Sequence, residues 1–75
     1  MTATKIPSSI HVYLTHKQLK ALSFRDKAVL TLNANLVLDG DEADGFFFPW
    51  STWNRIKADV FSFLPPHAVV ESLFF

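Results

Sequence analysis

The chain has 75 residues, with seven Lys and Arg against seven Asp and Glu, a formal net charge of zero and no cysteine. A chain of this length forms one domain at most, and its 49% hydrophobic content argues against intrinsic disorder. Zero net charge argues against a protein whose affinity comes from neutralising phosphates, and the lack of cysteine excludes disulfides and thiolate zinc sites.

The first residues, 1–8, predict a flexible tail that ends near Pro7, and residues 9–75 then form a single domain. The tail has no apolar run that resembles a secretory signal. No stretch of the chain approaches the ~20 apolar residues of a membrane span. We therefore expect a cytoplasmic protein that does not enter a membrane.

The domain begins with an alternation of apolar and polar residues from Ile10 to Leu14, which is the period of a half-buried strand. Thr15 followed by Gln18 matches a capping box. The sequence therefore predicts a short helix over residues 16–23 directly after the strand.

From Ala28 to Leu38, apolar residues occupy every second position. This alternation predicts one long strand, or two strands broken near Asn33 to Asn35. The loop over residues 39–45 then reverses the chain, because its glycines allow a turn. Residues 46–48 are all phenylalanine and predict a short strand that Pro49 stops.

A second helix should begin after Ser51 or Thr52, either of which can cap it. Apolar residues follow at helical spacing as far as Leu64. The pair Pro65 and Pro66 ends this helix, and residues 67–75 read as a last strand.

The order strand, helix, strand, strand, helix, strand predicts an α+β domain with the ferredoxin-like split β-α-β pattern (βαββαβ). Two helices then cover one face of a four-stranded antiparallel sheet, with the first and third strands in the middle and the other two at the edges. The alternative is another small α+β fold that forms a dimer, because the first helix is short. The other sheet face is open in this prediction.

Residues at the centre of this open face are the candidate binding site. His11 and Tyr13 point away from the helices, and the third strand adds either Phe47 alone or both of its neighbours. Contiguous exposed aromatic surface marks interaction sites. The candidate binding residues are His11, Tyr13, Phe46, Phe47, Phe48, Trp50 and the loop acids Asp41, Glu42 and Asp44.

The last strand is a candidate dimer edge. An unprotected apolar edge invites pairing with another chain, so we expect a homodimer or the addition of a partner's strand. The edge residues are Val70, Leu73, Phe74 and Phe75.

Two segments resemble the RNA-recognition motif family. The stretch VYLTHK from Val12 is similar to the first-strand motif of that family, and GFFFPW from Gly45 is similar to its third-strand motif. The resemblance implies that Tyr13, Phe46 and Phe48 stack on RNA bases. The sequence departs from the motif at Asp44, where the family has a basic residue, so single-stranded RNA binding is the alternative function.

No set of residues with the usual catalytic or metal-binding spacing occurs in the sequence. The three histidines lack zinc-like spacing, and there is no nucleophile elbow or glycine-rich phosphate loop. We therefore predict no enzyme activity, no metal and no cofactor. The leading hypothesis is a small protein-binding module, an inhibitor or adaptor of a larger protein, that recognises a protein partner through the open face, an edge strand and the acidic loop.

Overall fold

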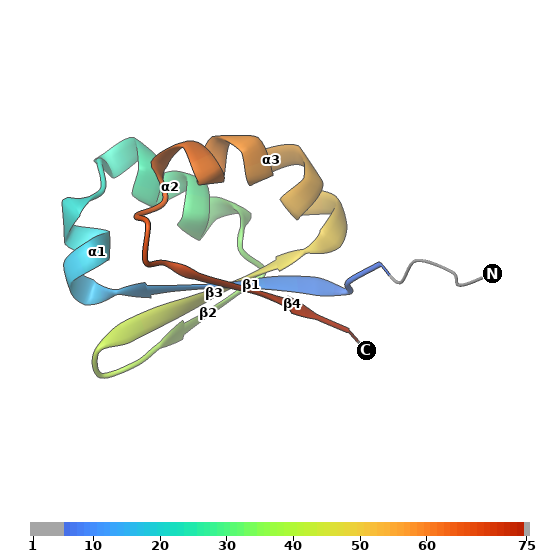
Figure 1. The fold of residues 1–75 in the computed structure, drawn as a ribbon, viewed down its shortest axis with the longest axis horizontal. Helices are drawn as coiled ribbons and strands as arrows, with labels where there is room; N and C mark the ends of the chain where they lie inside the picture. The colour runs from blue at the N-terminus through green and yellow to red at the C-terminus, as the bar shows by residue number, and fades with distance from the viewer. Residues whose placement is uncertain (1–5, 75) are drawn as a thin grey trace.

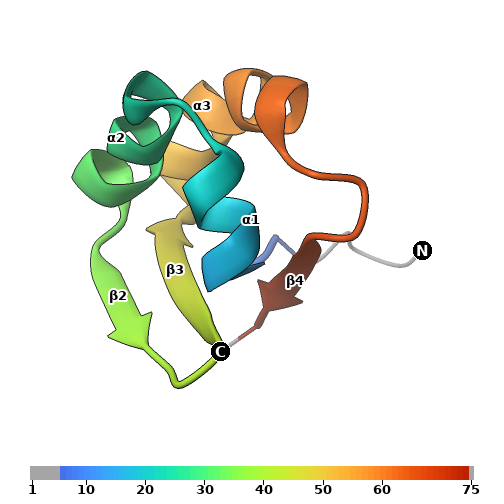
Figure 2. The same cartoon turned by 90° about the vertical axis from the view of Figure 1, so that its left-hand side faces the viewer.

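The computed structural model describes residues 6–74 and has four strands and three helices. In chain order the elements are β1 (Ser9–Thr15), α1 (His16–Ala21), α2 (Phe24–Asn33), β2 (Leu36–Asp39), β3 (Ala43–Pro49), α3 (Trp50–Phe63) and β4 (Val69–Leu73). The strands form one antiparallel sheet in the order β2-β3-β1-β4. Figure 1 shows the helices on one side of this sheet, and Figure 2 shows α2 and α3 on the same side in the turned view.

The prediction of a small α+β domain with an antiparallel sheet open on one face is confirmed. The first and third strands are central, and the second and fourth are the edges. The prediction of two helices is wrong, because the segment expected to be one long strand contains a third helix, α2.

The alternation after Ala28 was misleading because the intervening positions also include apolar residues, such as Val29 and Val37. A helix buries positions three and four apart, and Leu30 reaches the core while Leu32 stays outside. The local signal for this helix is Ser23, whose hydroxyl accepts a hydrogen bond from the Asp26 N–H as the N-cap. Strand β2 is therefore only four residues long.

The capping box before α1 is confirmed. Thr15 Oγ1 accepts from the Gln18 N–H at 3.1 Å, and Gln18 Oε1 accepts from the Thr15 N–H at 2.9 Å. The helix ends at Ala21 rather than at Ser23, because Ser23 caps the helix that follows. The backbone N–H of His16 also donates to the Glu42 carbonyl, so the start of α1 is joined to the β2–β3 hairpin.

The β2–β3 hairpin is tighter than the predicted loop over residues 39–45. Strand β2 ends at Asp39 and β3 begins at Ala43, so only residues 40–42 lie between the two strands. A Cβ atom on Gly40 would collide with the Ala43 carbonyl oxygen, and glycine is therefore required there. Strand β3 accordingly begins before the phenylalanines.

The cap predicted for the last helix is also wrong. Pro49 is the N-cap of α3, with no hydrogen bond from a side chain, and neither Ser51 nor Thr52 caps it. The helix ends at Phe63, two residues before Pro65, which agrees with the low helical tolerance of residues that precede proline. Strand β4 is shorter than the predicted last strand.

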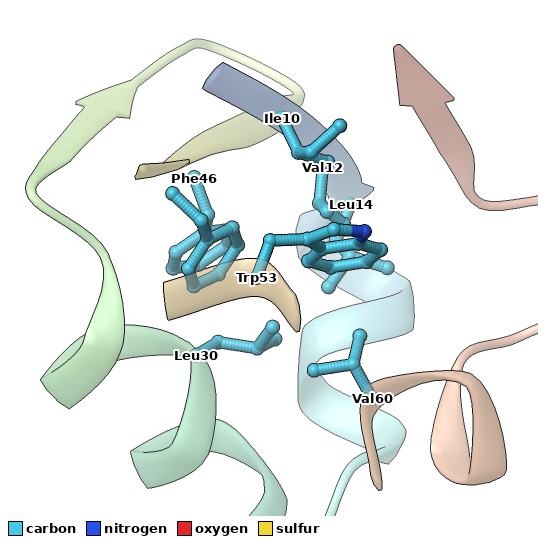
Figure 3. Close-up of a cluster of buried hydrophobic side chains, with 8 residues drawn as sticks. Ile10, Val12, Leu14, Leu30, Phe46, Trp53 and Val60 are labelled. Atoms are coloured by element: carbon cyan, nitrogen blue, oxygen red, sulfur yellow. The ribbon is translucent and has the colours of Figure 1, made fainter. Parts of the chain in front are cut away.

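The hydrophobic core lies between the sheet and the helices. Figure 3 shows buried side chains from the sheet and from α2 and α3 gathered there. Fully burying one such side chain stabilises a fold by about 1.5–3 kcal/mol. The core residues are Ile10, Val12 and Leu14 from β1, Phe46 and Phe48 from β3, Leu30 from α2, and Trp53 and Val60 from α3.

Candidate functional site

The side of the sheet opposite the helices is covered by no element of residues 6–74. Its side chains alternate with the core residues along each strand. We call this surface the open face. It consists of Ser9, His11 and Tyr13 from β1, Leu36 and Leu38 from β2, Gly45, Phe47 and Pro49 from β3, and Val69, Glu71 and Leu73 from β4.

The register of β1 with β3 decides which phenylalanine belongs to the open face. Ile10 pairs with Phe48, and Val12 pairs with Phe46, so both of these phenylalanines share the core side. His11 pairs with Phe47, which is the aromatic residue that β3 contributes to the open face. Because Phe46 and Phe48 are buried, neither ring is exposed for binding, and the base-stacking set that the RNA resemblance implied is wrong in these two members.

A stack of three rings occupies the centre of the open face. The His11 ring lies 3.7 Å from the Phe47 ring, with an interplanar angle of 19°, and 3.7 Å from the Tyr13 ring, with an angle of 46°. It also covers Gly45, where an added Cβ atom would collide with His11 Nε2. The absence of a side chain at Gly45 therefore makes room for the imidazole.

His11 is consequently only 4% exposed, although it lies on the open face, as the sequence predicted. Its Nε2 atom is buried and has no hydrogen-bond partner among residues 6–74. Burial lowers the pKa of His11, and the Glu71 carboxylate, which lies opposite it on β4, offsets that shift only in part. The imidazole therefore packs as a neutral ring among its neighbours on the open face and offers no charge to a partner.

Apolar side chains surround the ring stack. Tyr13, Leu36, Leu38 and Val69 are each exposed, and Phe47 is half-buried. At the end of the sheet where β1 begins, a hollow of about 390 Å³ crosses the sheet from β2 to β4. Its lining includes Ser9, Leu36, Phe47, Pro49 and Leu73.

Charge is divided between the two sides of the molecule. Every Lys and Arg among residues 6–74 lies on a helix, namely Lys17, Lys20, Arg25, Lys27, Arg55 and Lys57. The two acids on helices, Asp26 and Asp59, both bond to Arg25. The other acids, Asp39, Asp41, Glu42, Asp44 and Glu71, lie on the strands or the hairpin turn. The strands and the hairpin turn therefore carry acids and no Lys or Arg, although Asp39 and Asp44 have the register of the core residues and only Glu71 belongs to the open face.

The three acids predicted as binding residues differ in their surroundings. Asp41 and Glu42 are exposed at the hairpin turn. Asp44 is half-buried, and its Oδ1 lies 3.0 Å from His16 Nε2. Only the two turn acids are thus fully available to a partner.

Trp50 is not on the open face. It is the first residue of α3, is half-buried and packs against the core. Its backbone N–H donates to the Ser8 carbonyl at 3.3 Å. This hydrogen bond joins the start of α3 to the residue that precedes β1.

The described residues of the predicted dimer edge do not all lie on the same face of the sheet. Val70 points to the helix side of β4, whereas Leu73 belongs to the open face. Phe74 follows the strand and is exposed, and Phe75 lies outside the described residues. Within residues 6–74, β4 pairs only with β1, and β2 pairs only with β3.

Sequence analysis missed the leucines of β2 and Val69 as members of the open face, since they belong to strands whose registers it did not assign. Within residues 6–74, no group of three His, Asp or Glu side chains is arranged to hold a metal ion. No helix in that range is long and apolar enough to cross a bilayer.

Comparisons of the chain with protein-family models, with curated proteins and with solved structures gave no match. The surface chemistry of the molecule is therefore the basis for its functional interpretation.

Proposed function

We propose that the protein is a non-catalytic protein-binding module, an inhibitor or adaptor of a larger protein, and that the open face is its binding surface. The observation that carries this proposal is the continuous apolar surface around the His11 stack, which no element of residues 6–74 covers. Contiguous apolar patches of this kind mark interaction sites. Aromatic side chains such as Tyr13 and Phe47 are the usual anchors of protein interfaces.

The charge of the sheet side favours a partner with a basic surface. Asp41 and Glu42 at the hairpin turn, and Glu71 on the open face, would attract lysine and arginine side chains during the encounter. No lysine or arginine of residues 6–74 belongs to the open face. Replacing Asp41 and Glu42 with Asn and Gln should therefore slow association and reduce its dependence on salt.

The open face is a better candidate than a β4 edge for binding a second protein. Antiparallel pairing of β4 with another β4 about its middle residue, Glu71, would place two carboxylates opposite each other. Like charges in that position destabilise strand pairing. The homodimer predicted through this edge is thus the less favoured arrangement.

The test is affinity capture from the native lysate, with nuclease treatment, using the tagged wild type and the double variant Tyr13→Ala with Phe47→Ala. We expect the wild type to retain a stoichiometric protein that the variant loses, while both keep the same circular dichroism spectrum. The matched control is Phe61→Ala, which removes an exposed aromatic side chain from α3 and leaves the open face unchanged. Unchanged capture by the open-face variant, or its global unfolding, would contradict the proposal.

Single-stranded RNA binding is the second candidate, and the exposed Tyr13 ring beside His11 favours it. Stacking of a base on an aromatic ring contributes about 1–3 kcal/mol, but the acidic turn would repel phosphates. Titration of tyrosine and tryptophan fluorescence with oligonucleotides at low salt tests it. Salt-sensitive quenching would support RNA binding, and a flat titration would exclude it.

We further propose that the domain is a variant of the ferredoxin-like split β-α-β architecture in which the first connection contains two helices, α1 and α2. Support comes from the central position of β1 and β3 and from α3, which connects β3 to the opposite edge. Location in the cytoplasm stays a prediction.

A further inference from the structure

A second apolar surface lies on the outer side of α2. Phe24 is 88% exposed and Leu32 is 83% exposed, which makes them the two most exposed large hydrophobic residues of residues 6–74. They are eight positions apart on the helix, with Ala28 midway, so all three lie on one helical face. Lys27 and Thr31 complete a hollow of about 400 Å³ between the two large side chains. We call this surface the α2 stripe.

The core does not account for the α2 stripe. Helix α2 already buries Leu30 against the sheet, on a different side of the helix from Phe24 and Leu32. A helix with a second apolar face is suited to pack against two neighbours at once. Within residues 6–74, α2 contacts β3 and α3, and neither element covers Phe24 or Leu32.

We infer that the α2 stripe docks on the open face of a second copy of this chain. This inference rests on the proposed role of the open face as a protein-binding surface, and it names a second copy as the occupant of that face when the larger partner is absent. The two surfaces complement each other in charge. Lys27 lines the stripe, whereas the open face carries Glu71 and is flanked by the turn acids.

The two surfaces also complement each other in shape. Eight residues of helix rise about 12 Å, which is about two and a half times the spacing of ~4.8 Å between neighbouring strands. Phe24 and Leu32 can therefore both contact a four-stranded face. One of the two enters the hollow lined by Leu36, Phe47 and Leu73. A large apolar side chain in a pocket is the usual centre of a protein interface.

Since the stripe and the open face are different surfaces, the contact is heterologous. Each copy offers one surface to the copy before it and the other to the copy after it, so the assembly closes as a ring or extends as a chain. A twofold dimer, by contrast, uses the same surface on both copies. This difference makes the inference testable by mixing variants.

The test uses two variants of the full chain in sedimentation velocity. The face variant carries Leu36→Ser and Leu38→Ser, and the stripe variant carries Phe24→Ser and Leu32→Ser. All four residues are at least about half exposed, so both variants should fold. We expect the wild type to sediment as species larger than a monomer, with dissociation at high salt, and each variant alone to be monomeric.

The equimolar mixture of the two variants is the decisive measurement. Each variant keeps the surface that the other lacks, so the mixture should form a dimer of one copy of each and nothing larger. A monomeric wild type, a variant that assembles alone, or a mixture that stays monomeric would overturn the inference. If the wild type is monomeric while only the face variant loses lysate capture, the proposed function survives and this inference does not. If the face variant loses neither assembly nor lysate capture, both fail.

Discussion

The two faces of the sheet use the same strands but are stabilised in different ways. On the helix side, Phe46 and Phe48 pack among aliphatic residues and Trp53 with almost no exposure. On the open face, Phe47 is half-buried, and its nearest ring is the imidazole of His11. The helices therefore cover one face of the sheet. On the open face, the side chains of the strands cover one another in part.

Burial on a small sheet does not require a covering layer. His11 is buried because a glycine lies beside it and two aromatic rings flank it. The ring stack contributes to the stability of the free protein, while the exposed side chains around it stay available to a partner.

The largest expected effect comes from the core phenylalanine. Phe48→Ala should reduce the free energy of unfolding by about 3–5 kcal/mol, because it removes a fully buried ring. The matched change Phe47→Ala on the open face should cost less than half as much. Urea unfolding followed by circular dichroism measures both. Equal losses would mean that the open face is as much a core as the helix side.

Gly45→Ala tests how the open face is filled. The added methyl group collides with His11, so we expect a loss of about 1–3 kcal/mol in the free energy of unfolding. In the His11→Ala background the same change should cost much less, because the collision is gone. A double-mutant cycle by urea unfolding gives the coupling, and additive losses would disprove the close contact.

Ser23→Ala tests the stability of α2, one of the helices that cover only one face of the sheet. Loss of the N-cap of α2 should cost about 1 kcal/mol. The control is Ser51→Ala, which should have almost no effect because Ser51 caps no helix. Thermal unfolding of both variants decides between the cap found at Ser23 and the cap expected at Ser51.

The smallest expected effect is a dependence of stability on pH. Burial lowers the pKa of His11 below its ordinary value of 6.5, so the unfolded chain takes up a proton before the folded chain does. The free energy of unfolding should therefore be unaffected by this group above about pH 6.5 and should fall as the pH is lowered below it.

Urea midpoints measured between about pH 7.5 and about pH 5.5 check this dependence. His11→Phe, which keeps an aromatic ring in the stack, should reduce it, and the exposed His67→Gln should leave it in place. An identical pH dependence in His11→Phe and the wild type would show that other groups cause it.

Local signals in the sequence determined the parts of the fold that depend on neighbouring residues. Thr15 and Gln18 specify the start of α1, Pro49 marks the end of β3, and the alternation from Ile10 specifies a half-buried strand. These features depend on hydrogen bonds and periodicities within a few residues, so they can be predicted from the sequence alone.

Tertiary structure decided the features in which local preferences are balanced. The segment after Ala28 fits a strand or a helix by pattern, and its packing through Leu30 selects the helix. Three consecutive phenylalanines fit either register, and pairing with β1 places Phe47 on the open face. The burial of His11 likewise requires Gly45 on another strand. These outcomes depend on contacts between residues distant in the chain, whose free energies exceed the small local differences.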